Sequence, residues 1–378
     1  MYSRLLQPPK NNSFFLFGPR GTGKTTWVKS KFPNGLYLDL LEAELFNDFL
    51  ANPQRLENFI PKNFTDWIII DEIQRVPELL NEVHRLIEKY RYKFILTGSS
   101  PRKLRSGGTN LLAGRALTYN FYPLTSNELG KDFKLSKSLA YGNLPSIYAG
   151  NDPKAYLESY VKTYLEEEIQ HERITRNLSA FSRFLETASF SQSSVLNVST
   201  VARDCGAERK MAENYFSILE DLLIAYRIPV FSKKAKRRVM SHSKFYFFDV
   251  GMYRVLRPAG PLDMPEEIEG HALETLFLQE LKAINDYLDL GYEIYYWRTA
   301  GNLEVDFVLY GKRGIKAFEI KRTGKINSAM FKGLKAFSKD YPQAKTYFIY
   351  GGSRRLREGD IDILPINEAL AGLPDILK

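Results

Sequence analysis

Apolar runs alternate with amphipathic stretches along the first part of the chain. Runs that end in turn or acidic residues predict strands over 14–17, 35–40, 67–72, 94–100 and 116–123. Helical spacing follows over 42–59, with a break at Pro53, and over 77–90. Because buried parallel strands are continuously apolar, this pattern predicts an α/β domain with a parallel sheet.

Helical spacing dominates the middle of the chain. Breaks at 142–145 and 150–153 place a domain boundary near residue 152. The predicted elements are helices over 153–173, 178–190, 198–206 and 207–225 and strands over 228–231 and 244–249. The last two helices form a helix-turn-helix pattern, and the strands after them predict a winged-helix domain.

The last part of the chain has a different order of elements. Helices are predicted over 269–287 and 328–337, and strands over 292–297, 303–309, 315–321 and 346–350. This αβββαβ order is that of a restriction-endonuclease-like core. We therefore expect three domains, at residues 1–152, 153–260 and 261–378.

Composition narrows the class of protein. The 53 Lys and Arg residues exceed the 44 Asp and Glu residues by nine, which permits a polyanionic partner. The one cysteine, Cys205, excludes an internal disulfide framework and suits a reducing cytoplasm. No apolar run approaches the roughly 18 residues of a membrane span, so we expect a cytoplasmic protein without a membrane partner.

The most specific motif is GPRGTGKT at residues 18–25, which fits the phosphate-loop pattern G-x-x-x-x-G-K-[ST]. Its glycines let backbone N–H groups surround a phosphate, and the next helix points its positive end at the same place. Lys24 is expected to reach the phosphates of ATP, and the Thr25 hydroxyl to ligate Mg²⁺. A chance glycine turn is the alternative. The predicted nucleotide-binding residues here are Gly18, Gly21, Thr22, Gly23, Lys24, Thr25 and Thr26.

Asp71 and Glu72 end the strand over 67–72. Parallel sheets bind ligands at the carboxyl ends of their strands, so these acids are expected beside the phosphate loop. Asp71 would hold Mg²⁺ through water, and Glu72 would position or deprotonate the attacking water. The alternative is a pair of solvated acids that cap the next helix.

Further candidates follow the next strand. Thr97 or Ser99 would place a hydroxyl beside the γ-phosphate, and Ser99 is included in the predicted site. Arg102, Arg105 and Arg115 form a group from which an arginine finger could reach a neighbouring subunit of a homo-oligomer, with Arg115 as first choice. Each arginine is alternatively an ordinary surface charge.

Residues 227–244 carry seven Lys or Arg residues and no acid. A basic wing suits contact with DNA phosphates. The alternative is a winged helix that packs on protein and carries a solvated loop. The predicted DNA-binding residues are Lys233, Lys234, Lys236, Arg237 and Arg238.

The hairpin of the last domain predicts a metal site. Strand alternation places Glu304 and Asp306 opposite Val305 and Phe307. It likewise places Glu319 and Lys321 on one face, so acids and a lysine converge. Asp306 and Glu319 would bind Mg²⁺, Lys321 would orient or activate water, and Glu274 would complete the site from the helix. A salt-bridged exposed hairpin and a decayed nuclease fold are the alternatives.

The motifs GPRGTGKTT, WIIIDEIQRVP, FILTGSS, LAGRA, YGNLPSIY, FYFFDVGMYRVL and GNLEVDFVL with AFEIKR resemble a bacterial and archaeal family. Its members are AAA-type ATPases with a C-terminal domain of unknown function that includes an endonuclease-like fold. The resemblance implies ATP binding through Lys24, Thr25, Asp71 and Glu72. It also implies a helical or winged-helix middle and a nuclease-like end with Asp306, Glu319 and Lys321.

We therefore expect a Mg²⁺-dependent ATPase that binds and remodels or processes DNA, with branched DNA as a refinement. The C-terminal domain would grip or cleave that DNA. The alternative is a nucleotide-dependent switch that binds a protein partner, with an inactive nuclease-like fold as its binding module.

Overall fold

The computed structural model describes residues 2–102, 104, 112–165, 178–233, 237, 241–261 and 263–378. The chain divides into two compact units. The N-terminal unit comprises Leu6–Tyr122 and Asp221–Leu223, and the C-terminal unit comprises Met1–Leu5, Pro123–Glu220 and Ile224–Lys378. The segments 153–260 and 261–378 lie almost wholly in this second unit, so the boundary near residue 152 stays a prediction.

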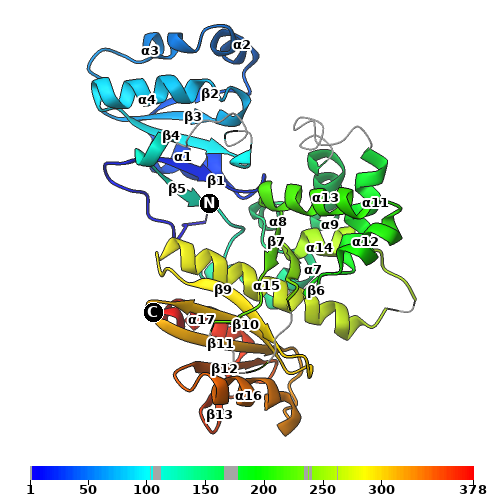
Figure 1. Cartoon of the computed structure of the whole chain (residues 1–378). Helices are drawn as coiled ribbons and strands as arrows, with labels where there is room; N and C mark the ends of the chain where they lie inside the picture. The colour runs from blue at the N-terminus through cyan, green and yellow to red at the C-terminus, as the bar shows by residue number, and fades with distance from the viewer. Residues whose placement is uncertain are drawn as a thin grey trace. The chain divides into compact units, whose positions relative to one another are not determined.

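The N-terminal unit is built on a parallel sheet with the strand order β2-β3-β4-β1-β5 (Figure 1). Its strands are β1 (Ser13–Phe17), β2 (Leu36–Asp39), β3 (Trp67–Asp71), β4 (Lys93–Gly98) and β5 (Ala116–Asn120). Its helices include α1 (Lys24–Lys31), α2 (Ala43–Ala51), α3 (Leu56–Phe59) and α4 (Leu79–Tyr90). The predicted α/β domain with a parallel sheet is confirmed.

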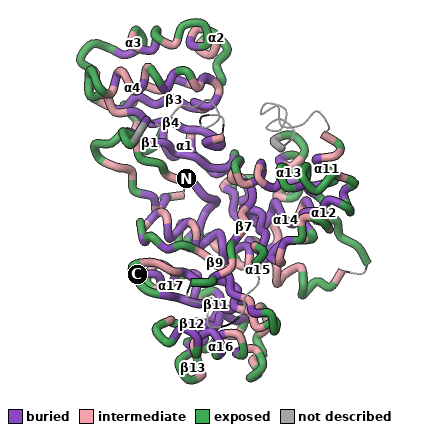
Figure 2. Tube along the Cα trace, viewed as in Figure 1, coloured by how far each residue is buried: buried purple, intermediate pink, exposed green. Residues whose placement is uncertain are grey.

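Every residue of β1 and β3 is buried, which explains the continuous apolar runs over 14–17 and 67–70 (Figure 2). Phe15 and Ile70 of these strands join one core cluster with Val83 of α4. Because the strands are parallel, β1, β3 and β4 end at the same edge of the sheet. The phosphate-loop sequence, Asp71 and the residues after Gly98 therefore meet there.

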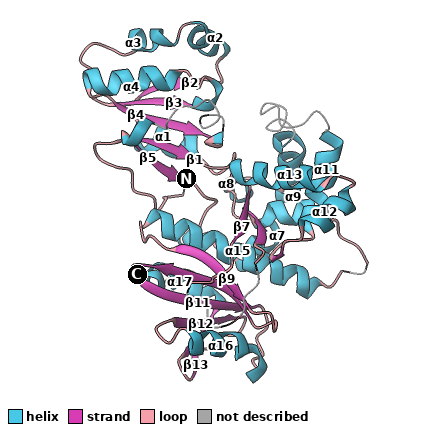
Figure 3. Ribbon diagram, in the orientation of Figure 1, coloured by secondary structure: helices cyan, strands magenta, loops and turns pink. Residues whose placement is uncertain are grey.

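The first part of the C-terminal unit is mainly helical (Figure 3). The helices include α6 (Ser126–Leu129), α7 (Leu135–Tyr141), α8 (Pro145–Ala149), α9 (Pro153–Ser159), a π-helix (Tyr160–Leu165), α11 (Leu178–Ser189), α12 (Val198–Cys205), α13 (Arg209–Asp221) and α14 (Val250–Leu256). Of the helix predicted over 153–173, residues 166–173 lie outside the described residues. The strands of an antiparallel sheet of order β6-β8-β7 alternate with these helices along the chain: β6 (Ser194–Val195), β7 (Ala225–Ile228) and β8 (Lys244–Phe247).

The strand predicted over 228–231 is wrong in position, because β7 runs from Ala225 to Ile228. Pro229 cannot donate to a ladder, so β7 ends before it. The next residues instead pair with another sheet: Phe231 N donates to Tyr296 O at 2.7 Å, and Tyr296 N donates to Pro229 O at 3.0 Å. This pairing joins the end of β7 to the C-terminal sheet.

The C-terminal sheet has the order β13-β14-β12-β11-β10-β9. Its strands are β9 (Glu293–Arg298), β10 (Glu304–Gly311), β11 (Gly314–Lys321), β12 (Lys345–Tyr350), β13 (Leu356–Glu358) and β14 (Ile361–Pro365). The helices of this part include α15 (Pro265–Tyr287), α16 (Lys332–Asp340) and α17 (Ile366–Leu377). The predicted order of elements is present, and β13, β14 and α17 add to it.

A β-bulge interrupts β10 between Val305 and Val308. Both of these valines join the core cluster that includes Phe337 of α16, whereas the Phe307 ring stacks on Phe277 of α15. The prediction that Val305 and Phe307 share one face is therefore wrong. A bulge inserts an extra residue and so breaks strict alternation.

Candidate functional site

The phosphate loop folds as its glycines require. Gly21 and Gly23 have φ of 80° and 91°, in the left-handed region. A Cβ at Gly18 would lie 2.2 Å from Phe121 O, so no larger residue fits there. Helix α1 begins at Lys24, whose Nζ donates to Gly18 O at 2.6 Å and to Pro19 O at 3.2 Å. The loop therefore encloses the lysine that the motif assigns to phosphate.

The Asp71 carboxylate, at the end of β3, accepts hydrogen bonds from three hydroxyl groups. The Thr25 hydroxyl donates to Asp71 Oδ2 at 2.8 Å, and the Thr97 hydroxyl donates to Oδ1. The Tyr37 hydroxyl, which comes from the neighbouring strand β2, also donates to Oδ2. Burial and then the hydrogen bond to Asp71 raise the pKa of Tyr37 well above its usual value. The structure thus brings Thr25 and Asp71 together as predicted.

Glu72 has a strained backbone, with φ of 60° in the left-handed region. Gln74 Nε2 donates to the Glu72 carboxylate and also lies 3.3 Å from Ser99 Oγ. Both hydroxyl candidates on β4 or just after it therefore reach the acids: Thr97 contacts Asp71 directly, and Ser99 reaches Glu72 through Gln74. Sequence reasoning missed Tyr37 and Gln74, because a tyrosine in a strand and a glutamine after an acid carry no signal.

The oxygen atoms of Thr25 and Asp71 are of the kind that Mg²⁺ prefers, and their direct hydrogen bond shows that they converge. Thr25 and Asp71 are therefore suitable ligands for the predicted Mg²⁺. Arg115 forms an ion pair with Glu88 at the surface, so its role as an arginine finger stays a prediction. Arg105 lies outside the described residues.

Of the predicted wing residues, Lys233 and Arg237 are described, and Lys234, Lys236 and Arg238 lie outside the described residues. Lys233 Nζ lies 2.7 Å from Glu293 Oε2, and Arg237 Nε lies 2.7 Å from Asp340 Oδ2. Glu293 begins β9, and Asp340 ends α16. The described wing cations are thus paired within their own unit.

The exposed residues of α13 and the residue before it carry both signs of charge. Arg209 and Lys210 are basic, whereas Glu208, Glu213 and Asp221 are acidic. A helix that reads DNA through charge is expected to be more basic than this.

The predicted residues of the hairpin do meet. The paired register of β10 and β11 ends at Phe307 and Phe318, so the strands separate beyond this pair. The Asp306 side chain lies in this opening, where Oδ2 accepts a hydrogen bond from Ile320 N at 2.8 Å. Lys321 Nζ lies 2.7 Å from Glu319 Oε1 and 3.6 Å from Asp306 Oδ2.

Lys244, at the start of β8, enters the same cluster. Its Nζ lies 3.5 Å from Asp306 Oδ1 and 3.6 Å from Glu274 Oε2, and it forms an ion pair with Glu304. The Tyr246 hydroxyl, also on β8, donates to Glu274 Oε2 at 3.1 Å. From the sequence alone, Lys244 counts among the basic residues of 227–244. Nothing in the neighbouring sequence indicates that it would pair with acids about 30 to 60 residues further along the chain.

Burial dominates the ionisation of these acids. It raises the pKa of Glu274 to about 7 and that of Glu319 to about 8, and the negative charge of Asp306 adds to both shifts. Burial alone would also raise the pKa of Asp306, but Lys321 and Lys244 lower it below its usual value. Of Glu274, Asp306 and Glu319, Asp306 therefore holds its charge most firmly.

A divalent metal does not fit this cluster as it stands. Within the described part of the chain, no three His, Cys, Asp or Glu side chains are placed to hold a metal ion. The Lys244 ammonium instead lies among the carboxylates, with a side chain that is 3% exposed. One atom, Glu319 Oε2, is buried and has no hydrogen-bond partner.

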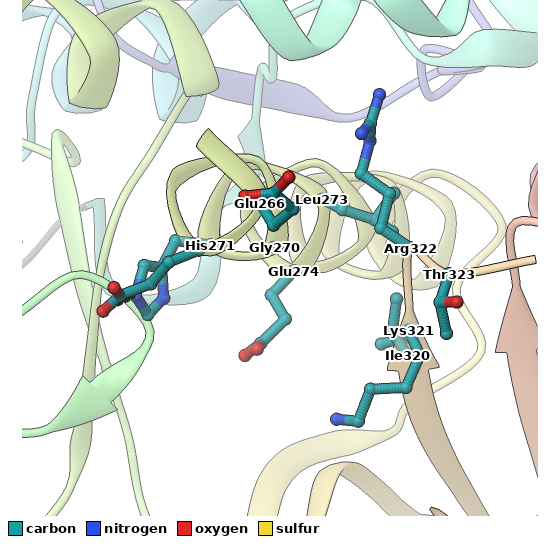
Figure 4. A pocket seen from close by; sticks show the side chains of 10 residues that line it. Glu266, Gly270, His271, Leu273, Glu274, Ile320, Lys321, Arg322 and Thr323 are labelled. Atoms are coloured by element: carbon teal, nitrogen blue, oxygen red, sulfur yellow. Dashed lines mark ion pairs between the residues drawn. The ribbon is translucent and has the colours of Figure 1, made fainter. Parts of the chain in front are cut away.

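A cavity of about 440 Å³ opens beside the cluster and is lined by Glu274 and Lys321 together with Glu266, His271 and Thr323. Figure 4 shows the side chains of Glu274 and Lys321 pointing to the same side, from α15 and from the end of β11. Solvent and small ions can therefore reach Glu274 and Lys321 at the edge of the cluster.

Comparisons with known proteins identify domains along the chain. Residues 10–130 match the AAA domain family AAA_14, residues 132–263 match a domain of unknown function (DUF8612), and residues 269–369 match a second one (DUF4143). The chain therefore contains an AAA-type ATPase domain followed by a C-terminal domain of unknown function, as the resemblance implied.

Two mycobacterial relatives are each 25% identical over 371 residues, which cover 95% of this chain and 79% of the relative. They are "Uncharacterized protein Mb2031c" of Mycobacterium bovis and "Uncharacterized protein Rv2008c" of Mycobacterium tuberculosis.

Among the described residues, no helix has both the length and the apolar composition that a membrane span needs.

Similar solved structures include the Aeropyrum pernix Orc1 protein in complex with DNA, at 13% identity and a TM-score of 0.26, covering 66% of this chain and 87% of that chain. Another is protein VC1899 from Vibrio cholerae, at 13% identity and a TM-score of 0.24, covering 91% of this chain and 97% of that chain. At these TM-scores, neither likeness bears on the function of this chain.

Proposed function

We propose that the protein is a Mg²⁺-dependent ATPase that uses its nucleotide state to control the binding of DNA. The observation that carries the ATPase assignment is the direct hydrogen bond between Thr25 and Asp71 at the end of β3, beside the loop that encloses Lys24. A hydroxyl and a carboxylate that meet beside a phosphate loop are the arrangement that ATP hydrolysis requires.

The residues then have separate roles. The N–H groups of the loop and of the start of α1 bind the phosphates, and Lys24 leaves the loop carbonyls to neutralise their charge. Mg²⁺, held by Thr25 and Asp71, would supply positive charge at the β- and γ-phosphates. Glu72 positions or deprotonates the attacking water, and Gln74 holds the Glu72 carboxylate toward Ser99.

DNA binding is assigned to the C-terminal unit. The element order α11-β6-α12-α13-β7-β8 supports a winged helix, and the αβββαβ order after it supports a restriction-endonuclease-like fold. The wing residues Lys233, Lys234, Lys236, Arg237 and Arg238 supply positive charge for phosphate contacts. In this account the C-terminal domain grips DNA.

A second candidate function is a nucleotide-dependent switch that binds a protein partner. The ion pairs of Lys233 with Glu293 and of Arg237 with Asp340 favour it, because they direct wing cations at acids of the same unit. A protein-binding module needs no free basic wing.

DNA gel shifts over a range of salt concentrations separate the two functions. The test variant replaces by glutamine the five wing cations Lys233, Lys234, Lys236, Arg237 and Arg238. If the wing binds DNA, this variant binds every duplex more weakly and its salt dependence is flatter. An unchanged salt slope would contradict the wing contact, and no binding by the wild type would favour the protein switch. ATPase rates measured with linear, single-stranded and branched DNA then show which structure couples to hydrolysis.

A further inference from the structure

The acid cluster of the C-terminal sheet, formed by Glu274, Glu304, Asp306 and Glu319, contains a positive charge from a distant strand. Lys244 reaches it from β8 and contacts the first three of these acids. The cation is buried, and its ion pairs fasten β8 to both α15 and β10. Lys244 itself lies on β8, outside the hairpin that carries Asp306, Glu319 and Lys321.

A divalent metal and the Lys244 ammonium compete for the same oxygen atoms. Mg²⁺ and Mn²⁺ take carboxylate oxygens at about 2 Å in a near-octahedral arrangement. Asp306 Oδ1 already faces Lys244 Nζ at 3.5 Å, and Asp306 Oδ2 accepts the Ile320 N–H and faces Lys321. Lys244 and Lys321 already face the two oxygens of Asp306, and a divalent ion there would add two more positive charges, so the ion and the Lys244 ammonium exclude each other.

We propose that Lys244 takes the place of the divalent cation in this cluster, so that the nuclease-like acids bind no metal while β8 is in position. The cluster then acts as an ionic clamp between the two sheets of the C-terminal unit. The proposal concerns this cluster alone and does not depend on ATP hydrolysis in the N-terminal unit.

The unpartnered oxygen of Glu319 shows what the cluster would do without Lys244. Glu319 is 7% exposed, and its Oε2 has no hydrogen-bond partner, whereas its other oxygen bonds to Lys321. Glu319, Asp306 and Glu274 are not placed to hold a metal ion while Lys244 lies between them, but removal of its ammonium frees oxygens of Asp306 and Glu274 to move toward an ion at Glu319 Oε2. The cavity of about 440 Å³ beside Glu274 and Lys321 provides the entry route (Figure 4). Loss of the Lys244 ammonium should therefore create a Mn²⁺ site.

The experiment titrates the full-length, nucleotide-free protein with Mn²⁺, measures bound Mn²⁺ by electron paramagnetic resonance, and follows thermal unfolding. The wild type should show no Mn²⁺ binding that depends on Asp306. Lys244→Gln should unfold roughly 10 °C lower without metal, because buried acids lose their partner. It should gain a Mn²⁺ site and recover at least half of the lost Tm.

Three variants make the result specific. Lys244→Gln combined with Asp306→Asn should lose the new site, and Lys244→Arg, which keeps the cation, should not create one. Lys335→Gln removes an exposed charge of the same unit and should match the wild type in Mn²⁺ binding and in Tm. All variants keep the ATPase site intact, so any Mn²⁺ bound there contributes equally to every measurement and is removed by comparison with the wild type.

The proposal is overturned if the wild type binds Mn²⁺ and Asp306→Asn abolishes that binding, or if folded Lys244→Gln gains none. Should Lys244→Gln fail to fold, wild type and Asp306→Asn decide the matter by themselves. Equal Mn²⁺ binding by the two supports the lysine-filled cluster, and loss of binding in Asp306→Asn refutes it.

Discussion

Replacement of Asp306 by asparagine tests whether the acid cluster stabilises the fold. Asparagine keeps the volume of the side chain and an oxygen for the Ile320 N–H, but it removes the negative charge that faces Lys244 and Lys321. Removal of one partner of a buried ion pair costs about 3–5 kcal/mol. Lys244 keeps Glu274 and Glu304, and Lys321 keeps Glu319, so we expect the loss to be about 2–3 kcal/mol.

This loss corresponds to a Tm of the C-terminal unit that falls by about 4–12 °C. Differential scanning calorimetry in metal-free buffer measures it, and the transition of the N-terminal unit is identified by its shift on addition of ATP. Glu358→Gln is the matched control, because Glu358 pairs with Lys335 at 2.7 Å at the exposed surface. An exposed pair contributes at most about 1 kcal/mol, so this control should remain near the wild type.

The effect of Asp306→Asn should also depend on pH. The pKa of Asp306 is lower in the folded protein than its usual value, so the ionised group stabilises the fold above about pH 4. That contribution disappears as pH falls through the folded pKa, and the two Tm values should converge in acid. An equal or higher Tm for Asp306→Asn at pH 7 would refute the reasoning, because repulsion between the acids would then outweigh the lysines.

Two further predictions concern Glu72 and Glu280. Glu72→Gln should still bind ATP but hydrolyse it at least about 10²-fold more slowly, because binding and water activation use different acids. A wild-type rate in single-turnover assays would contradict the assignment. Burial raises the pKa of Glu280 to about 8, so the folded state keeps a proton that the unfolded chain releases near pH 4.3. The unfolding free energy should therefore fall as pH rises from about 5 to about 8, and Glu280→Gln should flatten this decline in denaturant titrations. Parallel pH profiles for the two proteins would contradict this.

Most of the N-terminal site could be predicted from the sequence, because its residues lie in short stretches with a recognisable pattern. The phosphate loop binds through backbone groups that a fixed spacing of glycines makes available, and Asp71 ends an apolar run that had to be a strand. Tyr37 was not predictable in the same way. It reaches Asp71 because β2 pairs with β3, and this neighbour relation is a property of the sheet order.

The C-terminal site shows where sequence reasoning fails. Asp306, Glu319 and Lys321 were identified from spacing along one hairpin, but the bulge in β10 placed Phe307 on the face opposite to that expected. A bulge leaves no mark in the alternation of apolar residues. Lys244 was beyond reach for a different reason: its partners lie on α15 and β10, and only the folded unit brings them together.

Phosphate release from ATP by the wild type and by Lys24→Ala tests the central claim most directly. Lys31→Ala, at the exposed end of the same helix, is the matched control. The account predicts Mg²⁺-dependent hydrolysis that is abolished by a chelator, falls at least about 10²-fold in Lys24→Ala, and is unchanged in Lys31→Ala. Equal rates in the wild type and Lys24→Ala, or hydrolysis that persists without Mg²⁺, would contradict it.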